Sequence, residues 1–327
     1  MKGERVKEGK PFHVLSLTGG GFRGLYSTRV LQELEQRAGR PIGQCFDLIA
    51  GTSIGGILAL AVAFDCPMDT VIRAFRESGP KIFPPKGKLA GFLSSKYDTA
   101  PLCEVIDAIL PVGATLADAR HPLVIPALNL TTGKQQILKT RHNPEWTRDS
   151  KYSVKEIALA TAGAPIYFPI ASLDNQLFAD GGLFANAPDL VALHEANKFF
   201  GQPDSAVRML SVGTLSSTYA LPASAERRRG VWQWLRPPDF PLIQTILAAQ
   251  QQFSIQIVEH RLGDDHVRID GHPPDAVMRD VGLDKASPES QKVLLGLAAK
   301  HVTDVIGTAR VQQFLAHTPG QWLFKRN

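Results

Sequence analysis

Two glycine-rich segments near the start of the chain contain residue types suited to acyl-transfer chemistry. The later one, GTSIG at 51–55, has the G-x-S-x-G spacing of a nucleophile elbow, in which a sharp strand-to-helix turn exposes a serine hydroxyl, here that of Ser53. The earlier one, GGGFRG at 19–24, offers consecutive backbone N–H groups at a predicted helix start, where they stabilise a developing alkoxide. Each pattern alone is a weak signal, but the two in this order predict a serine nucleophile with an oxyanion hole.

A serine nucleophile needs a general base, and the sequence offers two kinds. Asp180 ends a strand-like run and precedes two glycines. Alternatively, a histidine completes a triad in the order serine, acid, histidine, and His266 or His272 has the required place in the chain. Only two strand-like runs precede Ser53, fewer than an α/β-hydrolase fold places before its elbow, and this favours Asp180.

The predicted elements place these residues where a strand turns into a helix. Apolar runs at 12–17 and 46–50 predict strands, each followed by one of the glycine-rich segments and then by a helix. Further strands are predicted over 123–130, 135–140, 176–179 and 207–212, and helices over 25–37, 53–64, 68–78, 102–110, 154–162 and 188–199. This alternation predicts an α/β fold, a three-layer α/β/α sandwich around a mostly parallel sheet.

The composition changes after residue 220. The stretch at 224–241 breaks the periodic pattern, and long helices are predicted over 242–261 and 290–314. We therefore expect an N-terminal tail (1–11), a catalytic domain (12–220) and a C-terminal elaboration (221–327) whose helices form a layer on the same domain.

Composition argues against several other classes of protein. Three scattered cysteines suit neither a disulfide framework nor a zinc site, and they favour a reducing compartment. The opening MKGERVKEGK lacks the apolar region of a secretory signal, and no run approaches the roughly 20 apolar residues of a membrane span. GGGFRG lacks the ending of a P-loop and the acidic partner of a dinucleotide fold. We expect a soluble, cytoplasmic protein without a metal or resident cofactor and without a nucleic-acid polymer as partner.

On these residues the chain resembles the patatin-like phospholipases, which combine a GGGxRG oxyanion loop, a GxSxG elbow and a DG[GA] motif in that order. The stretch ATAGAPIYFP at 160–169 is a fourth similarity, so the resemblance covers about 14–214, with Thr18 where the family often has Asp. The resemblance implies a dyad of Ser53 and Asp180 without a histidine. It also implies oxyanion donors at Gly19, Gly20, Gly21 and Ile54, and motif residues Arg23, Gly24, Gly51, Gly55, Gly181 and Gly182.

The implied reaction is hydrolysis of the fatty-acyl esters of membrane phospholipids. Asp180 would take the proton of Ser53 as the serine oxygen attacks the ester carbonyl, and partial desolvation should raise the pKa of Asp180 toward the working pH. Arg23 has three interpretations: a brace for the glycine loop, a contact to a phosphate, or a plain surface or structural arginine.

Two segments mix basic and large apolar residues in a way that suits peripheral contact with an anionic membrane, as does the net charge of +5. The segment at 80–97 contains Phe83, Leu89, Phe92, Leu93, Lys81, Lys86, Lys88 and Lys96. The segment at 227–234 contains three arginines followed by Trp232 and Trp234. The alternative for each is a lid, or a loop packed by its own aromatic side chains.

Within the patatin-like phospholipases, the chain resembles one subgroup in particular. The runs LSLTGGGFRGLYSTRVLQELE, FDLIAGTSIGGILALA and KIFP resemble the CapV-type effectors of bacterial CBASS anti-phage systems, patatin-like phospholipases activated by a cyclic dinucleotide such as cyclic GMP-AMP. That implies an enzyme nearly silent without its second messenger, acting at the inner face of the membrane. No nucleotide-binding motif is recognisable, although the arginines and tryptophans of 227–234 suit phosphate contacts and base stacking. A constitutive patatin-like lipase and a catalytically inactive scaffold protein are the alternatives, and oligomerisation stays open.

Overall fold

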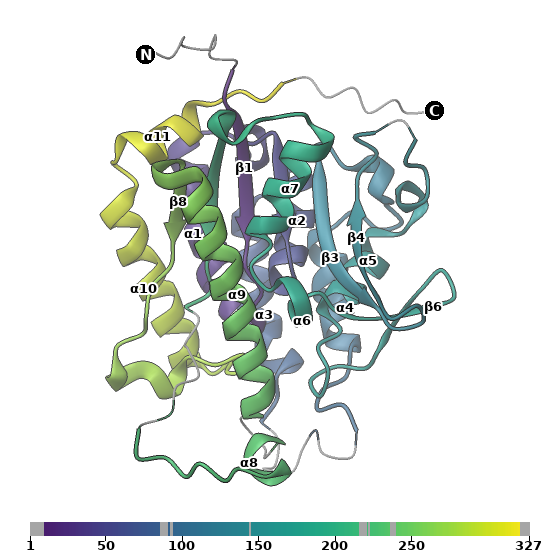
Figure 1. The fold of residues 1–327 in the computed structure, drawn as a ribbon, viewed down its shortest axis with the longest axis vertical. Coiled ribbons are helices and arrows are strands. Elements are labelled where there is room, and N and C mark those ends of the chain that lie inside the picture. Colours follow the sequence, from purple (N-terminus) through teal and green to yellow (C-terminus); the bar gives the residue numbers. More distant parts are fainter. Residues whose placement is uncertain are drawn as a thin grey trace.

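One eight-stranded sheet runs through the centre of the molecule, with helices on both faces (Figure 1). The computed structural model describes residues 10–85, 91, 94–143, 145–215, 221, 223–235 and 240–320. Its strands are β1 (Phe12–Leu17), β2 (Leu48–Gly51), β3 (Leu123–Asn129), β4 (Lys134–Lys139), β5 (Ala171–Leu173), β6 (Gln176–Asp180), β7 (Val207–Val212) and β8 (His266–Ile269). They pair in the order β5-β6-β3-β2-β1-β7-β8, and β4 pairs with β3.

The strands that carry the glycine-rich segments lie in the parallel part of the sheet. β3, β2, β1, β7 and β8 are parallel neighbours, whereas β4, β5 and β6 join by antiparallel pairs. Every residue of β1 and β2 is buried, as expected for parallel strands with helices over both faces. Both glycine-rich segments therefore begin at the carboxyl ends of adjacent parallel strands, where ligands bind in open α/β sheets.

The two faces of the sheet are covered unequally, because successive side chains of a strand point to opposite faces. Leu15 and Leu17 join a large core, while Phe12 and Val14 join a smaller one. The helices over the larger core are α1 (Gly24–Ala38), α2 (Ile54–Ala63), α3 (Met68–Ile82), α4 (Ala100–Ile109), α5 (Val154–Ala162), α10 (Pro288–Val305) and α11 (Ala309–Ala316). Those over the smaller core are α7 (Asp189–Phe199) and α9 (Pro241–Leu262). Two short helices, α6 (Gly182–Ala185) and α8 (Val231–Leu235), complete the set in the described residues, and α8 lies at the lower end of Figure 1.

The predicted layers and the mostly parallel sheet are confirmed, with corrections to single elements. The segment at 80–97 was predicted as a loop from Pro80 onward, but α3 continues to Ile82, where buried Gly79 and Ile82 pack into the core. The long helix predicted over 290–314 is two helices, α10 and α11. Strands β5 and β8 were not predicted, and β8 carries part of the C-terminal stretch into the central sheet beside β7. The boundary at residue 220 stays a prediction.

Candidate active site

Ser53 lies in the turn between β2 and α2 and has a backbone strained for a residue with a side chain. Its φ is 58° and its ψ is −128°. The turn fits only with glycine on either side: a Cβ at Gly51 would lie 2.1 Å from the Gly55 carbonyl oxygen, and one at Gly55 would lie 2.2 Å from that of Leu17. The Ser53 N–H donates to Thr161 Oγ1 at 3.0 Å, which holds the turn from below. The structure therefore has the nucleophile-elbow geometry that the G-x-S-x-G spacing predicts.

Asp180, the last residue of β6, lies opposite the Ser53 hydroxyl. Ser53 Oγ donates to Asp180 Oδ2 at 2.6 Å, and the Gly182 N–H donates to Asp180 Oδ1 at 2.7 Å. The Asp180 residue is only 5% exposed. Burial raises the pKa of this carboxyl to about 6, although the hydrogen bonds from Ser53 and Gly182 act to lower it. A group with this pKa is ionised at neutral pH and basic enough to accept a proton from a hydroxyl during attack.

The loop after β1 presents the candidate oxyanion donors. The Gly19 N–H donates to the Asn186 carbonyl at 2.9 Å, so this amide is already occupied. The N–H groups of Gly20, Gly21 and Ile54 donate to no acceptor among the described residues. Of the four amides predicted from the sequence, these three are thus open to a ligand.

Three side chains hold the glycine loop from the side of the core. The Gly19 carbonyl oxygen accepts from Asn186 Nδ2 at 3.4 Å and from Thr214 Oγ1 at 2.9 Å. Arg23 is buried and donates Nε to the Gly20 carbonyl oxygen at 3.3 Å and Nη1 to a carbonyl in the loop after β7 at 3.4 Å. Burial lowers the pKa of Arg23 to about 10, so it is still cationic at neutral pH. Of its three interpretations, the brace for the glycine loop is the one for which the geometry provides contacts.

The histidine triads do not form. His266 Nε2 lies 2.9 Å from Asp189 Oδ2, and both residues are buried away from Ser53, while Ser16 Oγ donates to Asp189 Oδ1 at 2.6 Å. Asp180 makes its side-chain hydrogen bonds with Ser53 and Gly182. None of the described residues that line the cavity beside Ser53 is a histidine.

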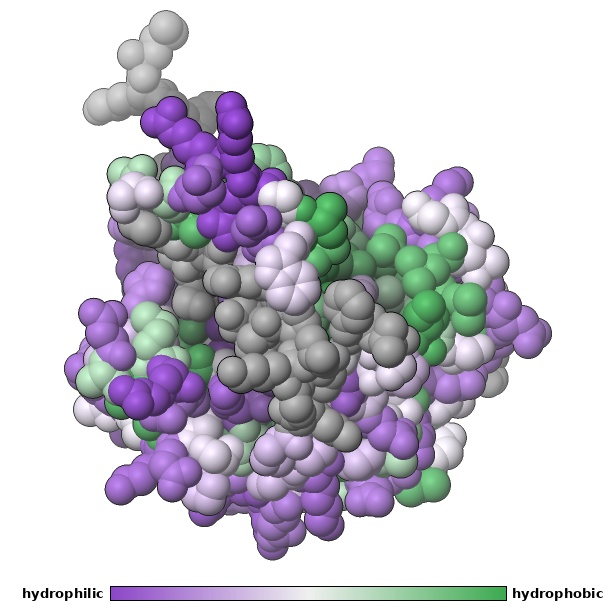
Figure 2. All heavy atoms as spheres, turned by 90° about the horizontal axis from the view of Figure 1, so that it is seen from below, coloured by the Kyte–Doolittle hydropathy of each residue, from purple (hydrophilic) through white to green (hydrophobic). Residues whose placement is uncertain are grey.

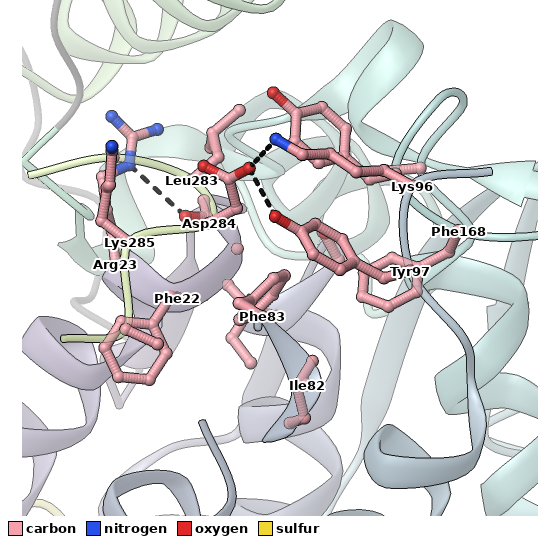
Figure 3. A pocket seen from close by; sticks show the side chains of 18 of the residues that line it. Phe22, Arg23, Ile82, Phe83, Lys96, Tyr97, Phe168, Leu283, Asp284 and Lys285 are labelled. Carbon is pink, nitrogen blue, oxygen red and sulfur yellow. Dashed lines mark hydrogen bonds and ion pairs between the residues drawn. The ribbon is translucent and has the colours of Figure 1, made fainter. Parts of the chain in front are cut away.

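That cavity has a volume of about 1010 Å³ and an apolar side and a charged side. The apolar side includes Ile57, Phe75, Ile82, Phe83, Leu102 and Phe168. The charged side includes Lys96, Arg279, Asp284 and Lys285. Figure 3 shows Phe22, Ile82 and Phe83 gathered on one side and Lys96, Asp284 and Lys285 on the other. A cavity of this kind fits a long apolar chain joined to a polar group.

The first segment predicted to meet lipid is partly packed inside. The Phe83 ring lies edge-on to Tyr97 and Phe168, with centroid distances of 5.2 and 5.8 Å, and Lys96 pairs with Asp284. Lys81 is exposed. The remaining residues of that prediction, Lys86, Lys88, Leu89, Phe92 and Leu93, lie outside the described residues.

The second such segment is on the surface. In α8, Val231 is 75% and Trp232 60% exposed. Trp234 is half-buried and stacks with Arg229, whose guanidinium carbon lies 5.6 Å from the ring centroid.

Sequence reasoning did not identify Asn186, Thr161 or Thr214. Each is a buried polar residue within two residues of the end of a predicted element, and each satisfies a backbone group near Ser53 or the glycine loop. That pattern is the signal available in the sequence, because buried polar side chains need hydrogen-bond partners.

Fold and site together define a class, ester hydrolases built on a three-layer α/β fold. Comparison with known proteins gives the family. Residues 15–193 match the model described as patatin-like phospholipase, and the chain belongs to that family. The resemblance stated from the motifs is thereby confirmed.

Three relatives match this chain over most of its length. It is 38% identical over 312 residues to a cGAMP-activated phospholipase of Pseudomonas aeruginosa, with 94% of this chain and 92% of the relative covered. It is 36% identical over 307 residues to one of Vibrio cholerae, with 85% and 86% covered, and 34% identical over 301 residues to one of Escherichia coli, with 85% of each covered. Within the described residues, no helix combines the length and apolar character needed to cross a bilayer.

Proposed function

We propose that this protein hydrolyses the fatty-acyl esters of phospholipids, with Ser53 as nucleophile and Asp180 as general base. Asp180 Oδ2 accepts the Ser53 proton while Oγ attacks the ester carbonyl, and the resulting alkoxide lies against open backbone amides. The protonated Asp180 then gives its proton to the departing lysophospholipid oxygen, which leaves an acyl ester on Ser53. Water, deprotonated by Asp180, releases the fatty acid and restores the serine.

The observation that carries this proposal is the 2.6 Å hydrogen bond from Ser53 to a carboxyl whose pKa burial raises to about 6. The open amides of Gly20, Gly21 and Ile54 add the electrostatic part, and each oxyanion donor lowers the barrier by about 3 kcal/mol. The donors are backbone N–H groups, whose direction does not change during the reaction. Thr18, at the position where the family often has Asp, therefore does not remove these donors.

Activation by a cyclic dinucleotide is the second part of the proposal. Three relatives are named as cGAMP-activated phospholipases. The similarity to the first of them covers 94% of the chain, well beyond the 15–193 of the family match, so it includes most of the C-terminal stretch.

The test is fatty-acid release from phospholipid vesicles, with and without cGAMP, by the parent protein and by Ser53→Ala. We expect strong stimulation by cGAMP and no release by Ser53→Ala under either condition. Equal release with and without every cyclic dinucleotide tried would favour the constitutive lipase. No release by the parent from any ester would favour the inactive scaffold.

We further propose that the surface around α8 and the start of α9 touches the membrane. Apolar side chains exposed there are Val231, Trp232, Leu235, Leu242 and Ile246, with Met278 at the cavity. Exposed cations are Arg227 and Arg228, just before α8 in the sequence, and Arg279 and Lys285, close to Met278 in the sequence. Figure 2, which views this end of the molecule, shows apolar and hydrophilic side chains next to each other. Apolar residues flanked by cations suit an anionic bilayer surface.

Replacing Val231, Trp232 and Leu235 together by serine should abolish hydrolysis of anionic vesicles and spare hydrolysis of a soluble short-chain ester. Val112→Ser, at a residue that is also highly exposed but lies outside the stretch from α8 to the start of α9, is the control. Equal losses on both substrates would exclude membrane contact through α8. Action at the inner face of the membrane, in the cytoplasm, stays a prediction.

A further inference from the structure

A short piece of backbone before α10, residues 281–285, contacts the glycine loop from the side opposite the core; we call it the strap. The Phe22 N–H donates to the Leu283 carbonyl oxygen at 2.7 Å. The same oxygen lies 2.2 Å from where a Cβ on Gly21 would be, and Gly21 has a φ of +57°. The strap and the loop thus meet so closely that only glycine fits at position 21.

The next residue of the strap is anchored by its side chain. The Asp284 carboxylate accepts from Lys96 Nζ at 2.5 Å and from the Tyr97 hydroxyl at 2.8 Å. The side chains of Lys96 and Asp284 are only 9% and 17% exposed, so water and salt screen the pair weakly. Burial and the nearby Asp284 raise the pKa of Tyr97, which therefore stays a neutral donor.

Lys96 and Tyr97 are themselves fixed to the body of the protein. Their N–H groups donate to the carbonyl oxygens of Ile166 and Tyr167, at 2.7 and 2.8 Å, in the turn that follows α5. The Tyr97 ring packs edge-on against Phe83. Figure 3 shows the Asp284 carboxylate directed toward Lys96 and Tyr97, with Arg23 on the other side of the strap.

The glycine loop is consequently held at two ends by different means. From the core, Arg23 fixes the Gly20 carbonyl. From the strap, the Leu283 carbonyl fixes the Phe22 N–H. The Gly21 N–H shares a peptide plane with the Gly20 carbonyl, and the next plane contains the Phe22 N–H, so the direction of the Gly21 amide depends on both restraints. Effective oxyanion stabilisation requires such donors to be fixed in advance of the reaction.

We propose that Asp284 is a positioning residue for ester hydrolysis: by binding Lys96 and Tyr97 it keeps Leu283 against Phe22 and so aligns the Gly21 amide of the glycine loop. This rests on the proposed function, because it assigns that amide to the oxyanion. Asp284 itself touches neither the substrate ester nor Ser53 in this role.

The test compares Asp284→Asn, Lys96→Met and the double variant on a soluble short-chain ester, with and without cGAMP. The number of competent sites is first counted from the endpoint of Ser53 labelling by a fluorophosphonate, so that loss of folded protein is separated from loss of rate. We expect kcat per labelled site to fall about 10- to 100-fold in each single variant, as expected for misplaced catalytic groups, with KM changed less than about threefold. The double variant should lose no more than the single ones, because all three break one contact.

Asp107→Asn is the matched control, since Asp107 forms an ion pair of 2.6 Å with Lys155 away from the cavity lining. It should leave kcat unchanged. Unchanged kcat per labelled site in the Asp284 and Lys96 variants would overturn the proposal, as would a loss confined to KM or to the number of labelled sites. Ser53→Ala is run in parallel: activity that survives in it contradicts the proposed function itself, whatever the strap variants do.

Discussion

Ser53–Asp180 and Ser16–Asp189 are both serine–aspartate pairs with a buried carboxyl and an oxygen–oxygen distance of 2.6 Å. Their electrostatics are opposite. Burial acts to raise the pKa of both carboxyls, but at Asp189 the hydrogen bond from His266 and the charge of Arg268 outweigh it and bring the pKa to about 2. At Asp180 no cation does so, and the pKa is about 6.

The two serines differ as much as the two carboxyls. Ser16 is in the middle of β1, fully buried in extended backbone. Ser53 is in a strained turn, lines the cavity and lies near open amides. The comparison teaches that a short serine–aspartate hydrogen bond does not by itself indicate a nucleophile: a poorly compensated carboxyl, an accessible hydroxyl and free donors are needed beside it.

The largest expected difference between the pairs is in activity. Ser53→Ala should lower kcat/KM by at least about 10⁴-fold, the scale seen when a nucleophile is removed. Ser16→Ala should change it less than about tenfold, since Ser16 only donates to a structural carboxylate. The measurement is hydrolysis of a soluble short-chain ester with cGAMP present. Comparable losses of kcat/KM in the two variants would contradict the distinction between a catalytic and a structural serine–aspartate pair.

The next difference is in stability at neutral pH. Asp189→Asn should lower the free energy of unfolding by about 3 kcal/mol, because it removes a buried carboxylate that accepts from Ser16 and lies beside His266 and the charge of Arg268. Asp180→Asn should keep or raise it while abolishing activity, because it removes a buried charge without an ionic partner. Urea unfolding of both variants measures this. A larger loss of unfolding free energy in Asp180→Asn than in Asp189→Asn would contradict the assignment of Asp180 as the catalytic and Asp189 as the structural carboxyl.

The contributions of Asp180 and Asp189 to stability change with pH in opposite directions. The pKa of Asp180 in the folded protein, about 6, is above the ordinary 3.8, so its contribution to stability is present below pH 3.8 and lost as the pH rises to about 6. The pKa of Asp189, about 2, is below it, so that contribution is present above pH 3.8 and lost as the pH falls toward 2.

The gain in unfolding free energy of Asp180→Asn over the parent should therefore grow between pH 4 and 6, by about 2–3 kcal/mol. Urea titrations at several pH values give this difference. A gain that is constant over the range would contradict a raised pKa for Asp180.

The smallest expected effect is on substrate preference, which depends on the cavity. Of the two pairs, only Ser53–Asp180 lines this cavity. Leu102→Phe should shorten the space on the apolar side and shift the ratio of kcat/KM between long and short acyl esters about tenfold toward the short ones. Leu294→Phe, at a buried residue of α10 that does not line the cavity, controls for overpacking. An unchanged ratio in Leu102→Phe would place the acyl chain elsewhere.

Much of the site could be predicted from the sequence because its geometry depends on glycine. The elbow and the glycine loop fold as they do only where no Cβ is present, and glycine is visible in sequence. The pairing of His266 with Asp189 was not visible, because it depends on β8, a four-residue strand that contains Arg268. So short and polar a run gives no periodic signal.

Two further features were beyond sequence reasoning for different reasons. The helix predicted over 68–78 ends before Pro80, but α3 continues beyond Pro80 to Ile82. Gly79 packs against the Phe22 ring, so a tertiary contact outweighed the local preference of proline to end a helix. The strap acts on Phe22 through the backbone carbonyl of Leu283, and a backbone contact leaves no mark on residue type.

The central proposal, that Asp180 and no histidine activates Ser53, is tested most directly by the pH dependence of Ser53 labelling with a fluorophosphonate. The parent should show an acidic limb with a midpoint near pH 6, set by the pKa of Asp180, and Ser16→Ala and His272→Ala should keep it. In Asp180→Asn, Ser53 should be labelled at least about 10³-fold more slowly than in the parent, and the labelling rate should not depend on pH across that limb. A limb that persists in Asp180→Asn, or that disappears in His272→Ala, would contradict the account.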